Sequence, residues 1–126
     1  DQVINFHIQN FKADIVIGSC KTKRIKDKSI VKLVFNKKGE VNDMTREDNF
    51  CKFDKKNLYK QVDIISFKPD KLQKFSALRQ TKNEIKRKIE LMRALDNKFK
   101  IKTVVVKTDS FSVNTKSDYE KAKKKY

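Results

Sequence analysis

The sequence has no tryptophan, one proline, two glycines and one histidine among its 126 residues. So little glycine and proline excludes collagen-like and low-complexity classes. A single histidine argues against a hydrolase triad or a histidine metal site. No run of 18 apolar residues occurs, which excludes a transmembrane helix, and we expect no signal peptide. Glycine-rich phosphate loops and nucleophile-elbow motifs are also missing, so the chain shows no self-sufficient active site.

Cysteine is scarce as well. Cys20 and Cys51 are far apart and neither belongs to a Cys-x-x-Cys pair, so the pattern does not support a zinc site. One disulfide between them stays open, but buried thiols in a reducing compartment are the favoured reading. We therefore expect the protein in the cytoplasm or in the reducing interior of an organelle.

The abundant residues are basic. The 32 Lys and Arg residues against 16 acidic ones give a net charge of +16, which favours a polyanionic partner such as RNA. Only 5 of the 32 are Arg, whose planar fork reads phosphates and bases better than Lys does. An AT-rich coding bias toward Lys and Asn would explain the same skew, so both explanations remain open. No membrane partner is expected.

Size and composition indicate one domain. Hydrophobic residues make up 37% and include nine Phe, and a chain of this length buries roughly two thirds of its unfolded surface. We treat residues 1–126 as a single domain, or as part of one. Because the chain starts at Asp1 without Met, we expect a piece of a longer protein or a trimmed chain.

Hydrophobic periodicity predicts the elements of the first half. Residues 2–12 carry apolar side chains at helical spacing, and 14–20 and 29–35 read as strands. Turn residues 36–39 then predict a hairpin with a partner strand over 40–45. The helix stripe contains Val3, Ile4, His7, Ile8 and Phe11. Because His7 lies on this stripe, we expect its side chain to be packed in the core.

The second half alternates strands and helices. Residues 58–67 form a predicted strand, Pro69 opens a short helix with Leu72 and Phe75, and 101–106 is another strand. Thr81–Glu84 is a capping box that starts a helix, and Thr115–Asp118 repeats it before a last helix. The inner face of the first of these helices would hold Ile85, Ile89, Met92 and Leu95. Such alternation predicts an α/β fold with a mixed sheet.

Several segments together resemble the sugar-acid cytidylyltransferases, that is, the 3-deoxy-manno-octulosonate and acylneuraminate enzymes. The strand and helix at 58–75 and the helix ending in Leu91–Asp96 are similar to consecutive segments of that family. The strand at 100–106 and the closing motif at 111–122 follow in the same order. Upstream, Val31–Val34 and Gly39–Arg46 are similar to a Val-Lys-Val-Val strand and a Gly…Ser-Arg turn. The likeness is collinear over about 100 residues.

The resemblance implies a nucleotide-diphospho-sugar transferase-like fold, of which this chain is the C-terminal portion. The family joins CTP and a sugar acid into a CMP-sugar and pyrophosphate with magnesium, and its nucleotide-binding half has no counterpart here. Residues implied to lie near the sugar-acid pocket are Arg46, Gln61, Glu84 and Glu90. The capping box explains Glu84 equally well, and we expect Arg93 to pair with Glu90 on the helix face.

Departures from the family pattern put catalysis in doubt. Asn114 stands where the family has a magnesium-binding Asp, and a neutral amide is a poor ligand for that hard cation. Lys116 replaces the Pro of the same motif, Arg87 replaces an acidic residue, and Asp63 replaces a Gly or Cys. We therefore expect no cofactor in this chain alone.

Residues 36–58 correspond to an arm that pairs with a second subunit in the family. Phe50, Phe53 and Tyr59 would then lie in an interface or core. The alternative is a base-stacking platform for RNA, because Lys52, Lys55, Lys56 and Lys60 interleave these rings.

An alternative function is a scaffold that has lost its chemistry and contacts RNA in a ribonucleoprotein assembly. The residues proposed for that surface are Lys86, Arg87, Lys88, Lys121, Lys123, Lys124 and Lys125.

Overall fold

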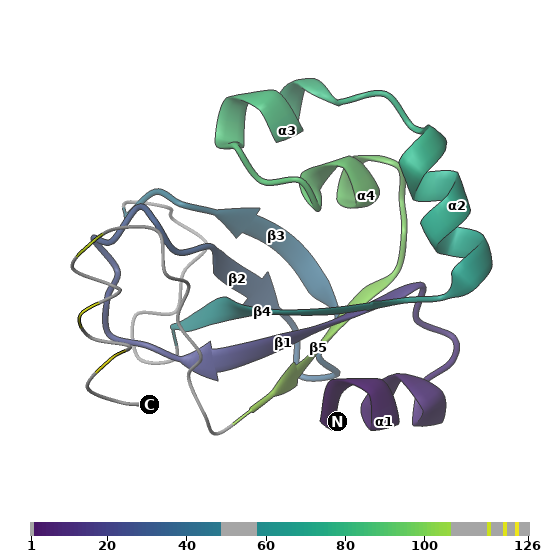
Figure 1. The fold of residues 1–126 in the computed structure, drawn as a ribbon, viewed down its shortest axis with the longest axis horizontal. Helices are drawn as coiled ribbons and strands as arrows, with labels where there is room; N and C mark the ends of the chain where they lie inside the picture. The colour runs from purple at the N-terminus through teal and green to yellow at the C-terminus, as the bar shows by residue number, and fades with distance from the viewer. Residues whose placement is uncertain (1, 49–57, 107–115, 117–119, 121–122, 124–126) are drawn as a thin grey trace.

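The computed structural model describes residues 2–48, 58–106, 116, 120 and 123. Within these residues a five-stranded mixed sheet is covered by helices on both faces (Figure 1). The helices are α1 (Gln2–Gln9), α2 (Pro69–Ala77), α3 (Lys82–Arg87) and α4 (Met92–Asp96). The strands are β1 (Ile15–Lys21), β2 (Lys32–Phe35), β3 (Val41–Thr45), β4 (Tyr59–Phe67) and β5 (Ile101–Val105).

The strand order is β3-β2-β4-β1-β5. β1 and β5 run parallel, and the other neighbours are antiparallel. β4 pairs with β1 from Tyr59 to Phe67, but it pairs with β2 only through Tyr59 and Lys60. The mixed-sheet prediction is therefore confirmed.

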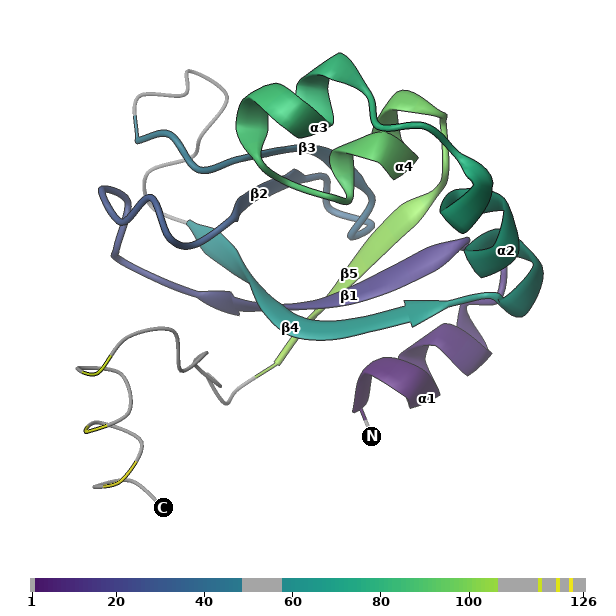
Figure 2. The same ribbon diagram turned by 45° about the horizontal axis from the view of Figure 1, so that its top comes forward.

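Two separate cores lie on the two faces of the sheet. Figure 2 shows α1 beneath the sheet and α2, α3 and α4 above it. The larger core joins the sheet to α2–α4, and its fully buried members include Ile15, Ile17 and Met44. The smaller one contains Val3, Ala13 and Val16 under α1.

Both glycines serve close approaches that a side chain would block. A Cβ on Gly18 would lie 2.6 Å from Cγ2 of Val62, so β1 and β4 could not approach each other as they do. Gly39 has φ +81° in the β2–β3 turn, where its carbonyl accepts from the Thr103 amide at 2.8 Å. The hairpin turn is thereby fixed to β5.

The predicted helix over 2–12 is shorter and more exposed than its pattern suggested. It ends at Gln9, and only Val3 and His7 are buried. Ile4, Ile8 and Phe11 are exposed, so the prediction of one buried stripe was wrong for these three residues. His7 is packed as expected: Nδ1 lies 2.7 Å from Oγ of Ser66 and Nε2 lies 2.8 Å from the Ala13 carbonyl oxygen.

The helix predicted after the Thr81 capping box is in fact two short helices. Lys88 adopts the left-handed conformation, φ 57°, and ends α3, while its amide donates to the Glu84 carbonyl. This turn redirects the chain so that Ile89 and Met92 are buried, whereas Ile85 on α3 is 61% exposed. The expectation that Ile85 faces inward was wrong.

The remaining strand and turn predictions agree with the structure. The hairpin of β2 and β3 forms, although β2 begins at Lys32 rather than at residue 29. Pro69 occupies the first turn of α2, and Phe75 packs against Phe67 at 5.3 Å between ring centroids, while Leu72 is exposed. Cys20 is buried in β1 as a thiol, whereas Cys51 and the second capping box lie outside the described residues.

Candidate functional site

Arg46 and Gln61 lie at the same end of the sheet. Thr45 on β3 and Lys60 on β4 both pair with Lys32, which lies on β2 between them. Arg46 and Gln61, the residues that follow Thr45 and Lys60, therefore lie about two strand spacings apart, roughly 10 Å. Gln61 points toward the face that carries α2–α4, because Tyr59, two residues earlier, is opposite the core residue Leu33. Arg46 also reaches that face, where its side chain contacts the end of α3.

Arg46 joins three segments through backbone carbonyls. Its Nε and Nη2 donate to the Lys88 carbonyl at 3.2 and 3.1 Å, and Nη1 donates to the Ser29 carbonyl at 2.7 Å. The left-handed turn at Lys88 is what brings that carbonyl to the end of β3. Arg46 is thus fixed in place at the same end of the sheet as Gln61, and its side chain is half-buried.

Glu84 is buried and paired with Arg93. Its carboxylate accepts from Nε of Arg93 at 2.8 Å and from Nη2 at 2.6 Å, while only 6% of its side chain is exposed. The hydrogen bond from Arg93 holds the pKa of Glu84 below its ordinary value, and the same bond raises the pKa of Arg93. We expected Arg93 to pair with Glu90, and the structure corrects this: the close partner is Glu84, from the neighbouring helix.

The capping box at Thr81 is confirmed. Thr81 Oγ1 accepts from the Glu84 amide at 3.2 Å and donates to Asp96 at 2.5 Å. Asn83 binds the other oxygen of Asp96 at 3.0 Å, so the start of α3 is joined by side chains to the end of α4. Glu90 lies exposed in the turn between these helices. Of the four expected pocket residues, Arg46 and Gln61 therefore share a face, Glu84 is occupied by Arg93, and Glu90 faces solvent.

A buried lysine supports the same end of the sheet from below. Lys32 is fully buried, and its Nζ donates to the carbonyls of Asp27 and Arg46 at 2.7 and 2.6 Å. Burial lowers the pKa of Lys32. The sequence did not predict this role for Lys32, because lysines are abundant throughout the chain and most are expected on the surface.

The basic residues of the RNA alternative are unequally available. Lys86, Lys88 and Lys123 are exposed, whereas Nη1 of Arg87 donates to Oδ1 of Asp43 and to the Met44 carbonyl at 2.7 Å. Arg87 therefore holds α3 against β3. Lys60, one of the interleaving lysines, is buried rather than open to a phosphate, and Tyr59 packs on Phe35 at 5.1 Å.

Several expected residues lie outside the described part of the chain. These are Asn114, Lys121, Lys124 and Lys125, together with Phe50, Phe53, Lys52, Lys55 and Lys56. Over the described ranges, no three His, Cys, Asp or Glu side chains gather in a way that would hold a metal ion. None of the helices that the described residues form is long and apolar enough to cross a membrane.

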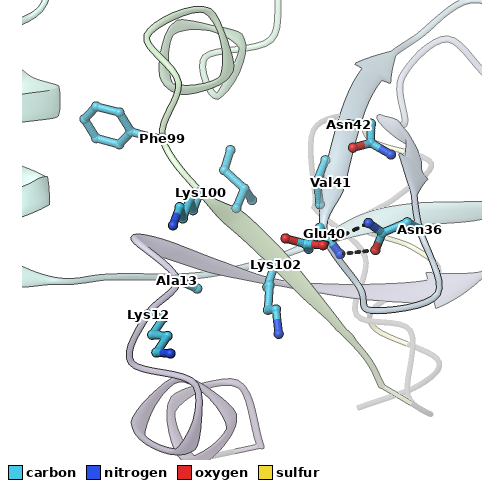
Figure 3. A pocket seen from close by; sticks show the side chains of 10 residues that line it. Lys12, Ala13, Asn36, Glu40, Val41, Asn42, Phe99, Lys100 and Lys102 are labelled. Carbon is cyan, nitrogen blue, oxygen red and sulfur yellow. Dashed lines mark hydrogen bonds between the residues drawn. The ribbon is translucent and has the colours of Figure 1, made fainter.

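An open pocket of about 410 Å³ lies at the opposite end of β1 (Figure 3). It is bordered by the loop before β1, the β2–β3 turn and the start of β5, and none of the expected site residues lines it. Lys12, Lys100 and Lys102 line it together with Glu40, and Asn36 donates to Glu40 at 3.0 Å. That hydrogen bond, with weaker help from Lys38 and Lys102, lowers the pKa of Glu40.

Several proteins of known name are similar to this chain in sequence. The 3-deoxy-manno-octulosonate cytidylyltransferase of Thermodesulfovibrio yellowstonii is 35% identical over 104 aligned positions, and the match covers 76% of this chain and 41% of that protein. The proteins of the same name from Chlorobium phaeovibrioides and Chlorobium phaeobacteroides are 33% and 30% identical, and the matches cover 78% and 82% of this chain and 41% and 43% of theirs. No protein-family model matches the chain.

A solved structure agrees with these relatives. CMP:2-keto-3-deoxy-manno-octonic acid synthetase in complex with CTP superposes with a TM-score of 0.87 at 20% identity, covering 98% of this chain and 53% of that one. The fold is thus that of the nucleotide-diphospho-sugar transferases. The chain belongs to the sugar-acid cytidylyltransferase family as a fragment, and it spans about two fifths of the length of the relatives it matches.

Proposed function

We propose that the chain contributes the sugar-acid pocket of a CMP-sugar synthetase-like protein. The single observation that carries this proposal is the placement of Arg46 and Gln61 on one face at one end of the sheet. A guanidinium suits the carboxylate of a sugar acid, and an amide suits its hydroxyls. The names of the relatives make 3-deoxy-manno-octulosonate the first sugar acid to test.

Each expected pocket residue has a distinct role in this proposal. Arg46 is held by the Lys88 and Ser29 carbonyls and would bind the carboxylate, and Gln61, on the same face, would bind hydroxyls. Glu84 acts through Arg93, since both of its oxygens accept hydrogen bonds from that guanidinium. Glu90, exposed in the turn before α4, would approach the ligand from the rim.

The complete reaction needs more than this chain. The family's nucleotide-binding half has no counterpart in the sequence, and the described residues do not gather magnesium ligands. Asn114 would leave the metal without one carboxylate. The chain's share of the work is accordingly to bind and orient the sugar acid, and we propose that residues 36–58 contribute a contact with a second subunit.

Calorimetric titration of the full chain with 3-deoxy-manno-octulosonate tests the sugar-acid pocket. We expect saturable binding that Gln61→Leu weakens at least tenfold, because the amide is lost while the strand remains. Gln73→Leu is the matched control, since Gln73 is exposed on α2. Absence of saturable heat in the wild-type chain, or equal affinity of the two variants, would overturn the proposal.

A second candidate is RNA binding by a scaffold that has lost catalysis. Exposure of Lys86 on α3 and of Lys88 directly after it, together with a net charge of +16, favours it. The pairing of Arg87 with Asp43 removes one member of the expected basic surface. The remaining lysines would contact phosphates without reading the sequence of the RNA.

A further inference from the structure

The pocket of about 410 Å³ at the start of β1, which we call the Glu40 pocket, has one cationic wall. Lys12 comes from the loop before β1, and Lys100 and Lys102 come from the start of β5. Lys102 points to the α1 face of the sheet, because the next residue on that face, Val104, packs under α1. Figure 3 shows the three lysine side chains on one side of β5 and Glu40 with Asn36 on the other.

The opposite wall of the Glu40 pocket carries hydrogen-bonding groups. Glu40 lies opposite Lys102 in an antiparallel bridge, so their two side chains share a face of the sheet. Asn36 donates to Oε1 of Glu40 at 3.0 Å and lowers the pKa of that carboxyl, which is therefore ionised at neutral pH. An ionised carboxylate only accepts hydrogen bonds, so Glu40 can bind hydroxyl groups of a ligand. The exposed amide of Asn42 lies on the same wall.

Backbone hydrogen bonds hold both walls in place. The Thr103 amide donates to the Gly39 carbonyl at 2.8 Å, which fixes the β2–β3 turn to β5. The Lys100 amide donates to the Asp14 carboxylate at 2.8 Å, and the Asp14 amide donates to the Lys100 carbonyl at 2.8 Å. The pocket is thus already formed, and a ligand would order little more than the ends of the lysine side chains.

The three lysines of this pocket lack carboxylate partners. Within the part of the chain that the structure describes, their ammonium groups form no hydrogen bond or ion pair. Asp14, beside the pocket, pairs with Lys71 at 3.8 Å instead. Because Glu40 is the one carboxylate among the described lining residues, the lining has a net charge of +2. A phosphate monoester, with a charge of about −1.5 to −2 at pH 7, matches this better than one carboxylate does.

We propose that the Glu40 pocket binds a sugar phosphate, either free or as part of a nucleotide. The phosphate would lie against Lys12, Lys100 and Lys102, because ammonium groups bind phosphate as point charges. Glu40 would accept hydrogen bonds from the sugar hydroxyls and would repel a second anionic group. The volume falls within the range of small-molecule sites. The inference goes beyond the proposed function, because none of the four residues expected to bind the sugar acid lines this pocket.

Amide chemical-shift titration of the full chain with ribose 5-phosphate tests the phosphate contacts. Saturable shifts should centre on residues 36–42 and 100–102. The double variant Lys12→Gln/Lys100→Gln should bind at least tenfold more weakly, because two of the three ammonium groups are lost. Lys74→Gln/Lys82→Gln removes two equally exposed lysines on α2 and α3 and should bind like the wild type. Equal weakening in the two double variants would show attraction by the net charge alone and would overturn the proposal.

Glu40→Gln separates hydroxyl recognition from attraction of the phosphate. This variant should bind orthophosphate more tightly, because a negative charge leaves the pocket. The ratio of its affinity for ribose 5-phosphate to that for orthophosphate should fall at least threefold, since the hydroxyls lose their acceptor. An unchanged ratio would mean that Glu40 only repels anions and would contradict recognition of the sugar.

Two further ligands identify the source of the phosphate and check the preference for it. Ribose 5-phosphate and AMP carry the same phosphate on a free sugar and on a nucleotide, and the tighter ligand of the two identifies the source. 3-Deoxy-manno-octulosonate, with one carboxylate, should bind to the Glu40 pocket at least tenfold more weakly than either. Equal affinity for this sugar acid, or no saturable binding of both phosphates, would overturn the proposal.

Discussion

Glu84 and Arg93 form a two-point ion pair across the break between α3 and α4, with N–O distances of 2.8 and 2.6 Å. The guanidinium also lies 4.8 Å from the centroid of the Phe75 ring, so the pair connects both helices to α2. Because the Glu84–Arg93 pair spans the turn at Lys88, it also supports that turn. The Lys88 carbonyl in turn orients Arg46.

Removing Arg93 should destabilise the protein. Arg93→Gln leaves the buried Glu84 carboxylate without its main partner, so the midpoint of thermal unfolding should fall by about 5 °C or more. Arg79→Gln, at an exposed position in the chain before α3, is the control and should shift the midpoint by about 1 °C at most. Equal midpoints for the two variants would show that the pair contributes nothing.

The Glu84–Arg93 pair also predicts how the stability of the protein changes at acidic pH. Since the pKa of Glu84 is lowered in the folded protein, its contribution to stability is complete above the ordinary value of 4.5 and is lost as the pH falls below it. Glu84→Gln should therefore lose less stability than the wild type when chemical unfolding is compared at pH 6 and pH 3. Parallel losses in the two proteins would contradict this assignment.

The buried Lys32 predicts a change in stability at alkaline pH. Burial lowers its pKa, so the unfolded chain binds more protons and the wild type gains stability as the pH rises toward 10.5. Lys32→Met removes the buried charge and should show a smaller rise in urea midpoint between pH 8 and pH 10.5. The other lysines act equally in both proteins. An equal rise in the two urea midpoints would therefore mean that folding does not lower the pKa of Lys32.

The break at Lys88 can be tested with one pair of substitutions. Lys88→Gly should raise the free energy of unfolding by about 0.5–1 kcal/mol, because glycine adopts the left-handed conformation without strain. Lys86→Gly, within α3, should lower it by a similar amount. If both variants were destabilised equally, the helix would continue through Lys88.

The strands and the first capping box could be predicted from the sequence, but the break at Lys88 could not. β-branched runs and turn residues mark strands locally, and Thr81 with Glu84 marks a helix start. At Lys88 the 3.6-residue period of Ile85, Ile89 and Met92 continues, and no glycine marks the left-handed turn. Packing of Ile89 and Met92 in the core decided the conformation there.

The sequence named residues for the candidate site but not their contacts. Arg46 and Gln61 come from the family resemblance, and the strand register brings them to one end of the sheet. The partner of Arg93 was misassigned as Glu90, because Glu84 is nine residues away in sequence and meets Arg93 only through the bend between two helices. Ile4 and Ile8 were expected inside, since periodicity does not say which apolar stripe of a helix meets the sheet.

Catalysis by the chain alone is not expected. Because the nucleotide-binding half has no counterpart and Asn114 replaces a carboxylate, the purified chain should release no pyrophosphate from CTP with 3-deoxy-manno-octulosonate and magnesium. A coupled phosphate assay with inorganic pyrophosphatase measures this. Turnover above that of a heat-inactivated sample would contradict the expectation.

RNA binding, if present, should depend steeply on salt. The logarithm of the affinity for a single-stranded RNA should fall with log salt at about −0.7 per phosphate neutralised. Charge reversal at Lys121, Lys123, Lys124 and Lys125 should flatten that slope. An equal effect from reversing four lysines elsewhere on the surface would indicate nonspecific attraction by the net charge.

Sugar-acid binding at the end of the sheet is the central claim, and amide chemical-shift mapping with 3-deoxy-manno-octulosonate tests it most directly. The account predicts saturable shifts that are largest at Arg46, Gln61 and the Lys88 turn. Shifts centred instead on Lys12, Lys100 and Lys102, at the opposite end of β1, would contradict it.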